Sequence, residues 1–140
     1  GKIEDGYIGS DIEGAFLRGL KRLESESGNL INSLNESVKV RATIVVSSDM
    51  VQSRAGDEGI VRTIRNMTNE QIAEFVTKSR GEQEFRELRP VVKIDGWLST
   101  TGKISERDRQ ALEVYWKKWF STLDLDEPDF GFGVMDWSVD

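Results

Sequence analysis

The stretch from Ser105 to Leu123 restricts the fold more than any other part of the sequence, because its large apolar residues recur at helical spacing. Ser105 and Asp108 stand three residues apart, a pattern typical of a capped helix start. The apolar residues that follow occupy one helical face, which must be buried against the rest of the chain. This face consists of Leu112, Tyr115, Trp116, Trp119, Phe120 and Leu123. The pattern predicts a long amphipathic helix that is the best-packed helix of the fold.

Two further helices are indicated upstream. One begins near Asp11, where Ser10 and Glu13 match a capping box. Gly14 and Gly19 are expected to weaken this helix and Gly28 to interrupt it. Its apolar face is made of Ile12, Phe16, Leu20 and Leu23, continued by Leu30, Ile31 and Leu34. The other begins at Thr68, which with Gln71 repeats the capping pattern, and ends near Gly81. The apolar face of this second helix is Ile72, Phe75 and Val76.

The clearest strand is the segment 38–46, in which β-branched residues alternate with polar ones. Val38, Val40, Ala42, Ile44 and Val46 share one face, while the other is polar near its start. Such a strand suits an antiparallel sheet covered by helices on one side. The pair Asp95-Gly96, between the segments 91–94 and 97–100, favours a two-residue hairpin turn.

These elements predict an α+β fold with a small, mainly antiparallel sheet, one long strand plus a hairpin, packed by about three helices. Residues 47–58 are expected to form a long loop. The segment 59–67 fits either a strand or a helical turn, and of the two we favour a short helix. Three strands would leave sheet edges exposed, and exposed edges invite pairing with another copy, so a homodimer is one expectation.

The 140 residues support one core rather than two, and the charge distribution divides the chain. Lys118 is the last basic residue, and six of the 25 acids follow it, so residues 1–123 carry 19 acids and 19 bases. We therefore expect a single domain over 1–123 and an acidic-aromatic tail over 124–140, since charge asymmetry of this kind often marks an interaction segment.

Composition excludes several classes of chemistry. The chain has no cysteine and no histidine, so disulfides, thiolate or imidazole metal sites and Ser-His nucleophiles are ruled out. We expect no metal and no cofactor. No apolar run is long enough for a membrane span, and the start lacks a signal-peptide pattern, so we expect a soluble, intracellular protein without membrane contact. The balanced body makes nucleic acid an improbable partner. The first residue is Gly rather than Met, compatible with an excerpt from a longer protein.

The tail carries the candidate contact residues. Its rings would dock in apolar pockets while its carboxylates meet Lys or Arg. These residues are Phe130, Phe132, Met135 and Trp137, with Asp124, Asp126, Glu127, Asp129 and Asp136. Two interpretations stay open: the tail lies on its own domain as an edge strand, or it binds a partner that offers a basic or apolar groove.

Three functions follow as hypotheses. The first is a non-catalytic protein–protein interaction module of the adaptor or assembly kind. The second is an acidic inhibitor or immunity-type protein that blocks a basic, nucleic-acid-binding or nuclease cleft. The third is a small carboxylate-dependent hydrolase, which needs two acids converging in one pocket.

Overall fold

Helices and strands alternate along the described part of the chain, which the computed structural model gives as residues 11–34, 41–51, 59–81, 86, 88–98 and 104–131, with the backbone alone for 30–34. The elements are α1 (Ile12–Leu34), β1 (Thr43–Ser47), α2 (Ile60–Ile64), α3 (Asn69–Arg80), β2 (Val91–Asp95) and α4 (Glu106–Ser121). The predicted mixed α+β class is confirmed, with four helices and a two-stranded sheet in these ranges.

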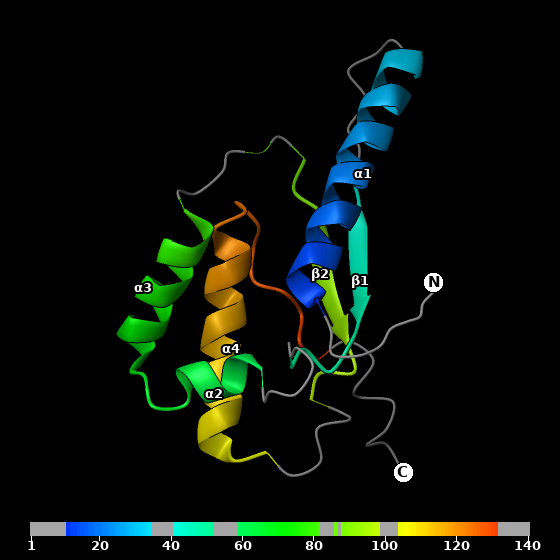
Figure 1. The fold of residues 1–140 in the computed structure, drawn as a ribbon. Coiled ribbons are helices and arrows are strands. Elements are labelled where there is room, and N and C mark those ends of the chain that lie inside the picture. The colour runs from blue at the N-terminus through cyan, green and yellow to red at the C-terminus, as the bar shows by residue number, and fades with distance from the viewer. Residues whose placement is uncertain are drawn as a thin grey trace, which may run out of the picture.

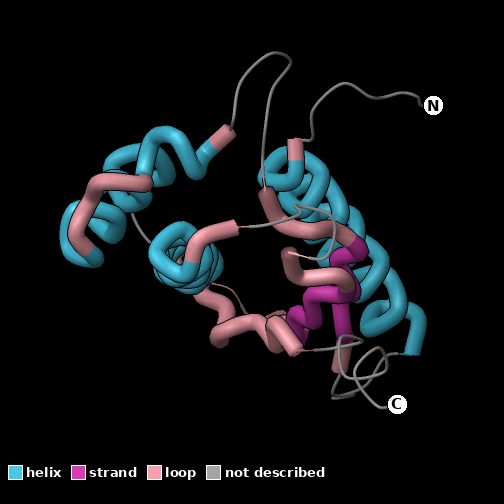
Figure 2. Tube along the Cα trace, turned by 90° about the horizontal axis from the view of Figure 1, so that it is seen from below, coloured by secondary structure: helices cyan, strands magenta, loops and turns pink. Residues whose placement is uncertain are grey.

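α4 lies at the centre of the fold, between α2 and α3 on one side and α1 with the two strands on the other (Figures 1 and 2). The N–H of Asp108 donates to Ser105 Oγ at 3.0 Å, so the predicted cap is present. All six residues of the predicted apolar face, from Leu112 to Leu123, are at most 5 % exposed. The predicted helix and its buried face are therefore confirmed.

α1 is capped one residue later than predicted. The N–H of Gly14 donates to Asp11 Oδ1 at 3.0 Å, while Ser10 lies outside the described residues. The helix also continues through Gly28 to Leu34 without interruption. Phe16 is buried and meets the rings of Trp119 and Phe120 edge-on, at 5.7 and 4.9 Å between centroids, which anchors α1 to α4.

The predicted short helix and capped helix correspond to α2 and α3. The capping box of α3 is complete: the N–H of Gln71 donates to Thr68 Oγ1 at 3.1 Å, and the N–H of Thr68 donates to Gln71 Oε1 at 2.9 Å. Gly81 ends α3 at φ 90°, a conformation that favours glycine.

Replacing Thr68 by alanine is expected to lower the free energy of unfolding by about 1 kcal/mol, because the N–H of Gln71 loses its acceptor. Urea denaturation followed by circular dichroism measures this loss. Thr77→Ala in the same helix is the control. The Thr77 hydroxyl donates to the carbonyl of Ala73 within the helix, so it does not act as a cap. Equal losses for the two variants would contradict the capping role.

The sheet differs from the prediction, because β1 and β2 run parallel, with Thr43 opposite Val91 and Ser47 opposite Asp95. The antiparallel prediction was wrong. A parallel pair needs a crossover connection, and here that connection contains α2 and α3. The predicted apolar face of this strand was right, since Ile44 and Val46 pack against the core. The predicted earlier start of the strand, at 38–40, lies outside the described residues.

The predicted hairpin at Asp95-Gly96 is also wrong in the described residues. β2 does end at Asp95, but residues 96–98 form a turn rather than a returning strand. Gly96 has φ 94° and Leu98 has φ 58°, and the N–H of Leu98 donates to the carbonyl of Asp49 at 3.0 Å. This turn directs the chain out of the sheet, so β2 takes β1 as its neighbour.

The other edge of β2 is occupied by Asp129, from the predicted tail. The N–H of Asp129 donates to the carbonyl of Val92 at 2.9 Å, and the N–H of Ile94 donates to the carbonyl of Asp129 at 2.8 Å. The bridge is parallel. β2 is therefore the inner strand of the sheet, with β1 on one side and Asp129 on the other.

Candidate functional site

The outer edge of β1 is an unpaired strand edge within the described structure. The carbonyl of Ala42 accepts from the N–H of Val91, and the N–H of Ser48 donates to the carbonyl of Asp95, both at 2.9 Å. Bonding residues alternate along a parallel ladder, so the peptide groups of Thr43, Val45 and Ser47 face away from β2. Their N–H and C=O groups are free to pair with another strand.

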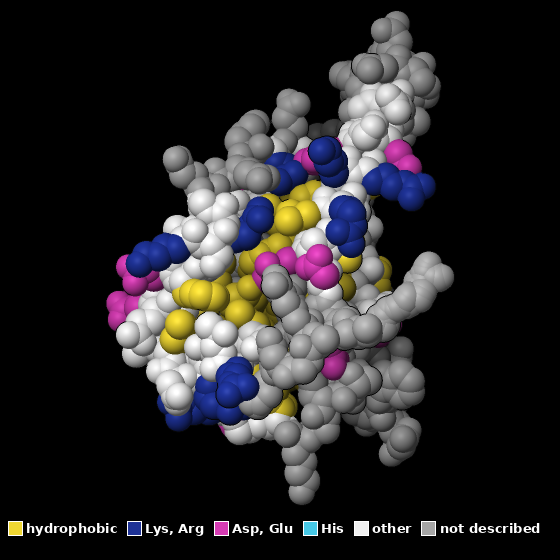
Figure 3. All heavy atoms as spheres, viewed as in Figure 1, with side chains coloured by type: hydrophobic (Ala, Val, Ile, Leu, Met, Phe, Trp, Pro, Cys, Tyr) yellow, Lys and Arg dark blue, Asp and Glu magenta, His cyan; other side chains and the backbone are white. Residues whose placement is uncertain are grey.

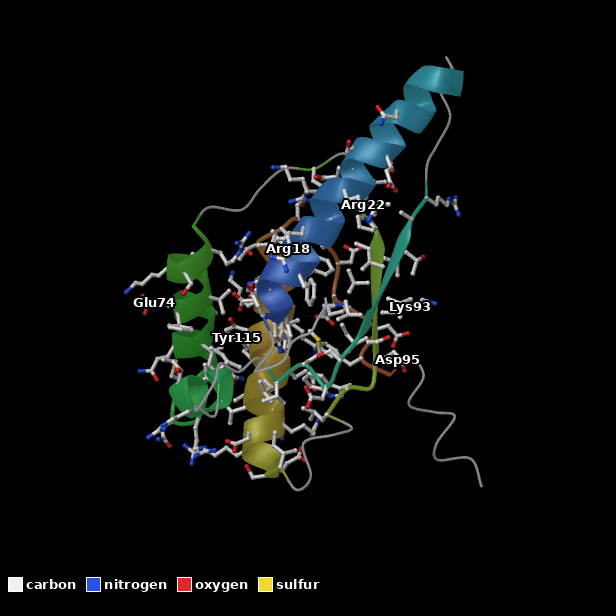
Figure 4. The ribbon with its side chains drawn as sticks, turned by 45° about the vertical axis from the view of Figure 1, so that its right-hand side comes forward. Arg18, Arg22, Glu74, Lys93, Asp95 and Tyr115 are labelled. Carbon is white, nitrogen blue, oxygen red and sulfur yellow. The ribbon has the colours of Figure 1, made fainter. Side chains whose placement is uncertain are left out.

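One face of the sheet is open as well. Val45 and Val91, the two large apolar side chains most exposed in the described residues, lie on it and are 49 % and 55 % exposed. The register places Lys93 beside Val45 on the same face. In Figure 4 the side chains of Lys93 and Asp95 point away from the helices. The edge of β1 is thus flanked by a partly apolar open face.

A pocket of about 440 Å³ lies between the first half of α1 and the length of β1. Ile12 and Phe16 from α1 and Ile44 and Val46 from β1 provide apolar walls. The α1 side also contains the small residues Ala15 and Gly19, and a Cβ built on Gly19 meets no atom within 4 Å. We call the unpaired edge of Thr43–Ser47 together with this pocket the β1 groove.

Among the described residues that line the pocket, one carries a carboxylate: Asp11, which caps α1. The two converging acids that the hydrolase hypothesis requires are not seen among the described lining residues. In the described residues, no group of three or more Asp and Glu side chains is arranged to hold a metal ion. Arg18, next to the pocket residue Gly19, and Arg22, one turn further along α1, are both exposed (Figure 4).

Asp124, one of the predicted contact residues, is engaged within the chain. It has φ 60° and lies at the end of α4, where Arg89 Nη2 reaches its carboxylate at 3.0 Å. The N–H of Arg86 donates to the same carboxylate at 3.1 Å. The Arg86 side chain is 7 % exposed, pairs with Glu24 of α1 and donates to the carbonyl of Leu123 at 2.7 Å. This network fixes the chain after α4 to α1.

The rest of the described tail lies along the domain. Leu125 is 5 % exposed and Pro128 is buried. The ring of Phe130 lies 4.6 Å from that of Trp97, so this predicted contact residue packs within its own chain. Asp126 and Glu127 are exposed, and Glu127 Oε1 is 3.7 Å from Lys117 Nζ. Asp129 has an exposed side chain, and its backbone bridges β2.

The other predicted contact residues, Phe132, Met135, Asp136 and Trp137, lie outside the described residues. Their role stays a prediction. The structure therefore brings Asp124, Phe130 and the backbone of Asp129 to the body of the domain, while the carboxylates of Asp126, Glu127 and Asp129 are exposed.

A buried polar pair lies where α1 meets α4. The hydroxyl of Tyr115 donates to the carboxylate of Glu13, and the ring of Tyr115 is 5 % exposed (Figure 4). Burial raises the pKa of Tyr115 far above its usual range, and the hydrogen bond to Glu13 raises it further. The hydroxyl stays protonated at neutral pH, so this pair serves to hold α1 on α4.

Apolar side chains also reach the surface in the strip between α1 and α3, with Lys and Arg side chains around them (Figure 3). Leu17 of α1 and Phe75 of α3 are partly buried residues that pack on the core.

The sequence analysis did not identify the β1 groove. A usable signal was present, because the segment Thr43–Ser47 contains neither a charged residue nor proline, the residues with which natural sheets protect an exposed edge. That signal identifies an unprotected strand, but only the fold shows which strand lies at the edge.

No protein-family model matches the chain, and no curated protein sequence and no solved structure is significantly similar to it. Among the described helices, none combines the length and the apolar character that a membrane crossing requires.

Proposed function

We propose that this chain is a non-catalytic protein–protein interaction module whose contact surface is the β1 groove. The observation that carries the proposal is the unpaired edge of Thr43–Ser47 beside an apolar pocket. Peptide groups at a strand edge gain hydrogen bonds when a further strand is added, and an adjoining pocket accommodates alternate side chains of that strand.

The lack of edge protection supports the proposal. β1 is five residues long, carries no charge, and exposes Val45 on the open face. Such an edge favours association, whereas charged or proline-containing edges oppose it. A module that functions by association accounts for an edge of this composition.

The tail adds a weaker argument for an interaction role. The carboxylates of Asp126, Glu127 and Asp129 remain exposed, so they are the carboxylates of the described tail that a basic partner would meet first. Asp124 and Phe130 already have partners within the chain. We therefore place the main contact at the β1 groove and treat the tail as a flanking surface.

Filling the pocket tests the proposal. Gly19→Trp puts a large ring into the β1 groove, and the open space around Gly19 lets the helix accept it. Because glycine weakens a helix interior by about 1 kcal/mol relative to alanine, we expect no loss of folding stability. Affinity capture from cells that express the chain, compared by mass spectrometry, should show that Gly19→Trp loses the proteins retained by the wild type.

Gly28→Trp is the matched control, since Gly28 is also an exposed α1 glycine with no atom within 4 Å of a built Cβ, and it does not line the pocket. It should retain the same proteins as the wild type. If Gly19→Trp retains them equally well, the β1 groove is not the contact surface.

A further inference from the structure

We propose that the partner in the β1 groove is a second copy of this chain, which pairs its own β1 antiparallel to the first across a twofold axis at Val45. The inference rests on the proposed function and names its partner. It requires that one edge be complementary to itself, and three features of β1 and α1 meet that requirement.

The first feature is the hydrogen-bond register. The outward peptide groups belong to Thr43, Val45 and Ser47, which are spaced symmetrically about Val45. In an antiparallel pair centred there, Val45 faces Val45 of the second copy, and Thr43 faces Ser47. Residues of this kind exchange both N–H···O=C bonds, so every outward N–H and C=O of the strand finds a partner. The two sheets join into one.

The second feature is the side chains that come together. Residues facing each other in such a pair lie on one side of the sheet, about 5.5 Å apart between Cα atoms. The half-exposed Val45 side chains of the two copies then contact each other on the open face. The hydroxyls of Thr43 and Ser47 meet at either side, and no like charges are opposed within the strand.

The third feature is the distribution of small and charged residues on α1, which runs opposite to β1 (Figure 1). A twofold axis through Val45 places the two α1 helices antiparallel on the same side of the joined sheet. Ala15 and Gly19 permit close approach in the middle. Asp11 lies at one end of this stretch and Arg18 at the other, so opposite charges face each other across the axis.

Sedimentation velocity of the full chain tests the inference. The wild type should sediment with twice the chain mass of 15.8 kDa in a concentration-dependent equilibrium. Val45→Glu opposes two like charges at the axis and should raise the dimer dissociation constant about tenfold or more. Val91→Glu, the matched control on β2, places the same charge on the same open face away from the edge and should stay dimeric.

Mixing two variants gives the sharper test. Val45→Glu and Val45→Lys should each be monomeric at a concentration at which the wild type is dimeric. An equimolar mixture at that concentration should recover the dimer mass, because opposite charges then face each other at the axis. Circular dichroism shows that each variant is folded. Recovery on mixing requires residue 45 of one copy to face residue 45 of the other, which damage to the fold would not produce.

A wild type that remains monomeric at every concentration, or a mixture that remains monomeric, overturns the second copy as the partner. The proposed function has its own criterion. If the wild type is monomeric yet Gly19→Trp still abolishes capture of another protein, the β1 groove binds a different chain and only the second-copy inference is wrong. If the wild type is monomeric and Gly19→Trp changes nothing, both are wrong.

Discussion

Trp116→Ala is expected to lower the free energy of unfolding by about 3 to 5 kcal/mol, the range for removing a large ring from a closed core. The Trp116 side chain is 0 % exposed and contacts the rings of Tyr115, Trp119 and Phe120. It also donates its indole N–H to the carbonyl of Met50 at 2.8 Å, which holds the loop after β1 against α4. Urea denaturation followed by circular dichroism measures the loss.

Trp116→Phe separates the contribution of the buried ring from that of the indole hydrogen bond. It keeps a ring in the core but removes the indole N–H, leaving the carbonyl of the buried Met50 without that donor, at an expected cost of about 1 to 3 kcal/mol. Trp97→Ala is the control, since Trp97 is only partly buried. If Trp116→Ala and Trp97→Ala lose the same stability, α4 is not the centre of the core.

Arg86→Met is expected to cost about 3 to 5 kcal/mol, because removing one member of a buried ionic network leaves its partners without compensation. Arg86 joins Glu24 of α1 to the carbonyl of Leu123 after α4, and its side chain is 7 % exposed. Thermal unfolding by calorimetry, with the enthalpy measured for each variant, gives the change in stability.

Arg22→Met is the matched control for Arg86→Met. Arg22 also pairs with a glutamate of α1, Glu26 at 3.0 Å, but its side chain is 82 % exposed. An exposed pair of this kind contributes about 0 to 1 kcal/mol, so the control should unfold close to the wild type. Similar losses of folding stability in Arg86→Met and Arg22→Met would mean that burial of Arg86 adds nothing to the strength of its network.

The helices could be predicted from sequence because their signals are local. The Thr68 and Gln71 box, the cap at Ser105 and the spacing from Leu112 to Leu123 depend on residues within a few positions of one another. Capping bonds and helical faces form in the same way wherever such spacing occurs. Even the error at α1 was one residue, Asp11 in place of Ser10.

The sheet could not be predicted in the same way, because its pairing joins distant segments. Asp95-Gly96 favours a hairpin locally, but the turn at Gly96 and Leu98 and the bond to Asp49 direct the chain elsewhere. The pairing of Thr43 with Val91 spans a connection that holds two helices, and no local pattern encodes its direction. The sequence alternation gave the inward face of β1 correctly and left its edge unidentified.

In the tail, too, local features could be predicted from the sequence and contacts with distant residues could not. Its acidic and aromatic composition was visible in the sequence, and so was the possibility that it lies on its own domain. The partner residues were not, because Arg86 and Arg89 stand more than 30 positions upstream of Asp124. A charge that is prominent in sequence can thus be neutralised within the fold.

The central place of α4 has a consequence for the order in which the chain can fold during synthesis. Phe16 of α1, the carbonyl of Met50 after β1, and α3 all depend on contacts with α4, which leaves the ribosome after every one of them. Contacts between distant segments form slowly, since the intervening chain must first be ordered. We expect nascent chains that end before residue 106 to remain sensitive to protease, and resistance to arise only once Ser121 has emerged.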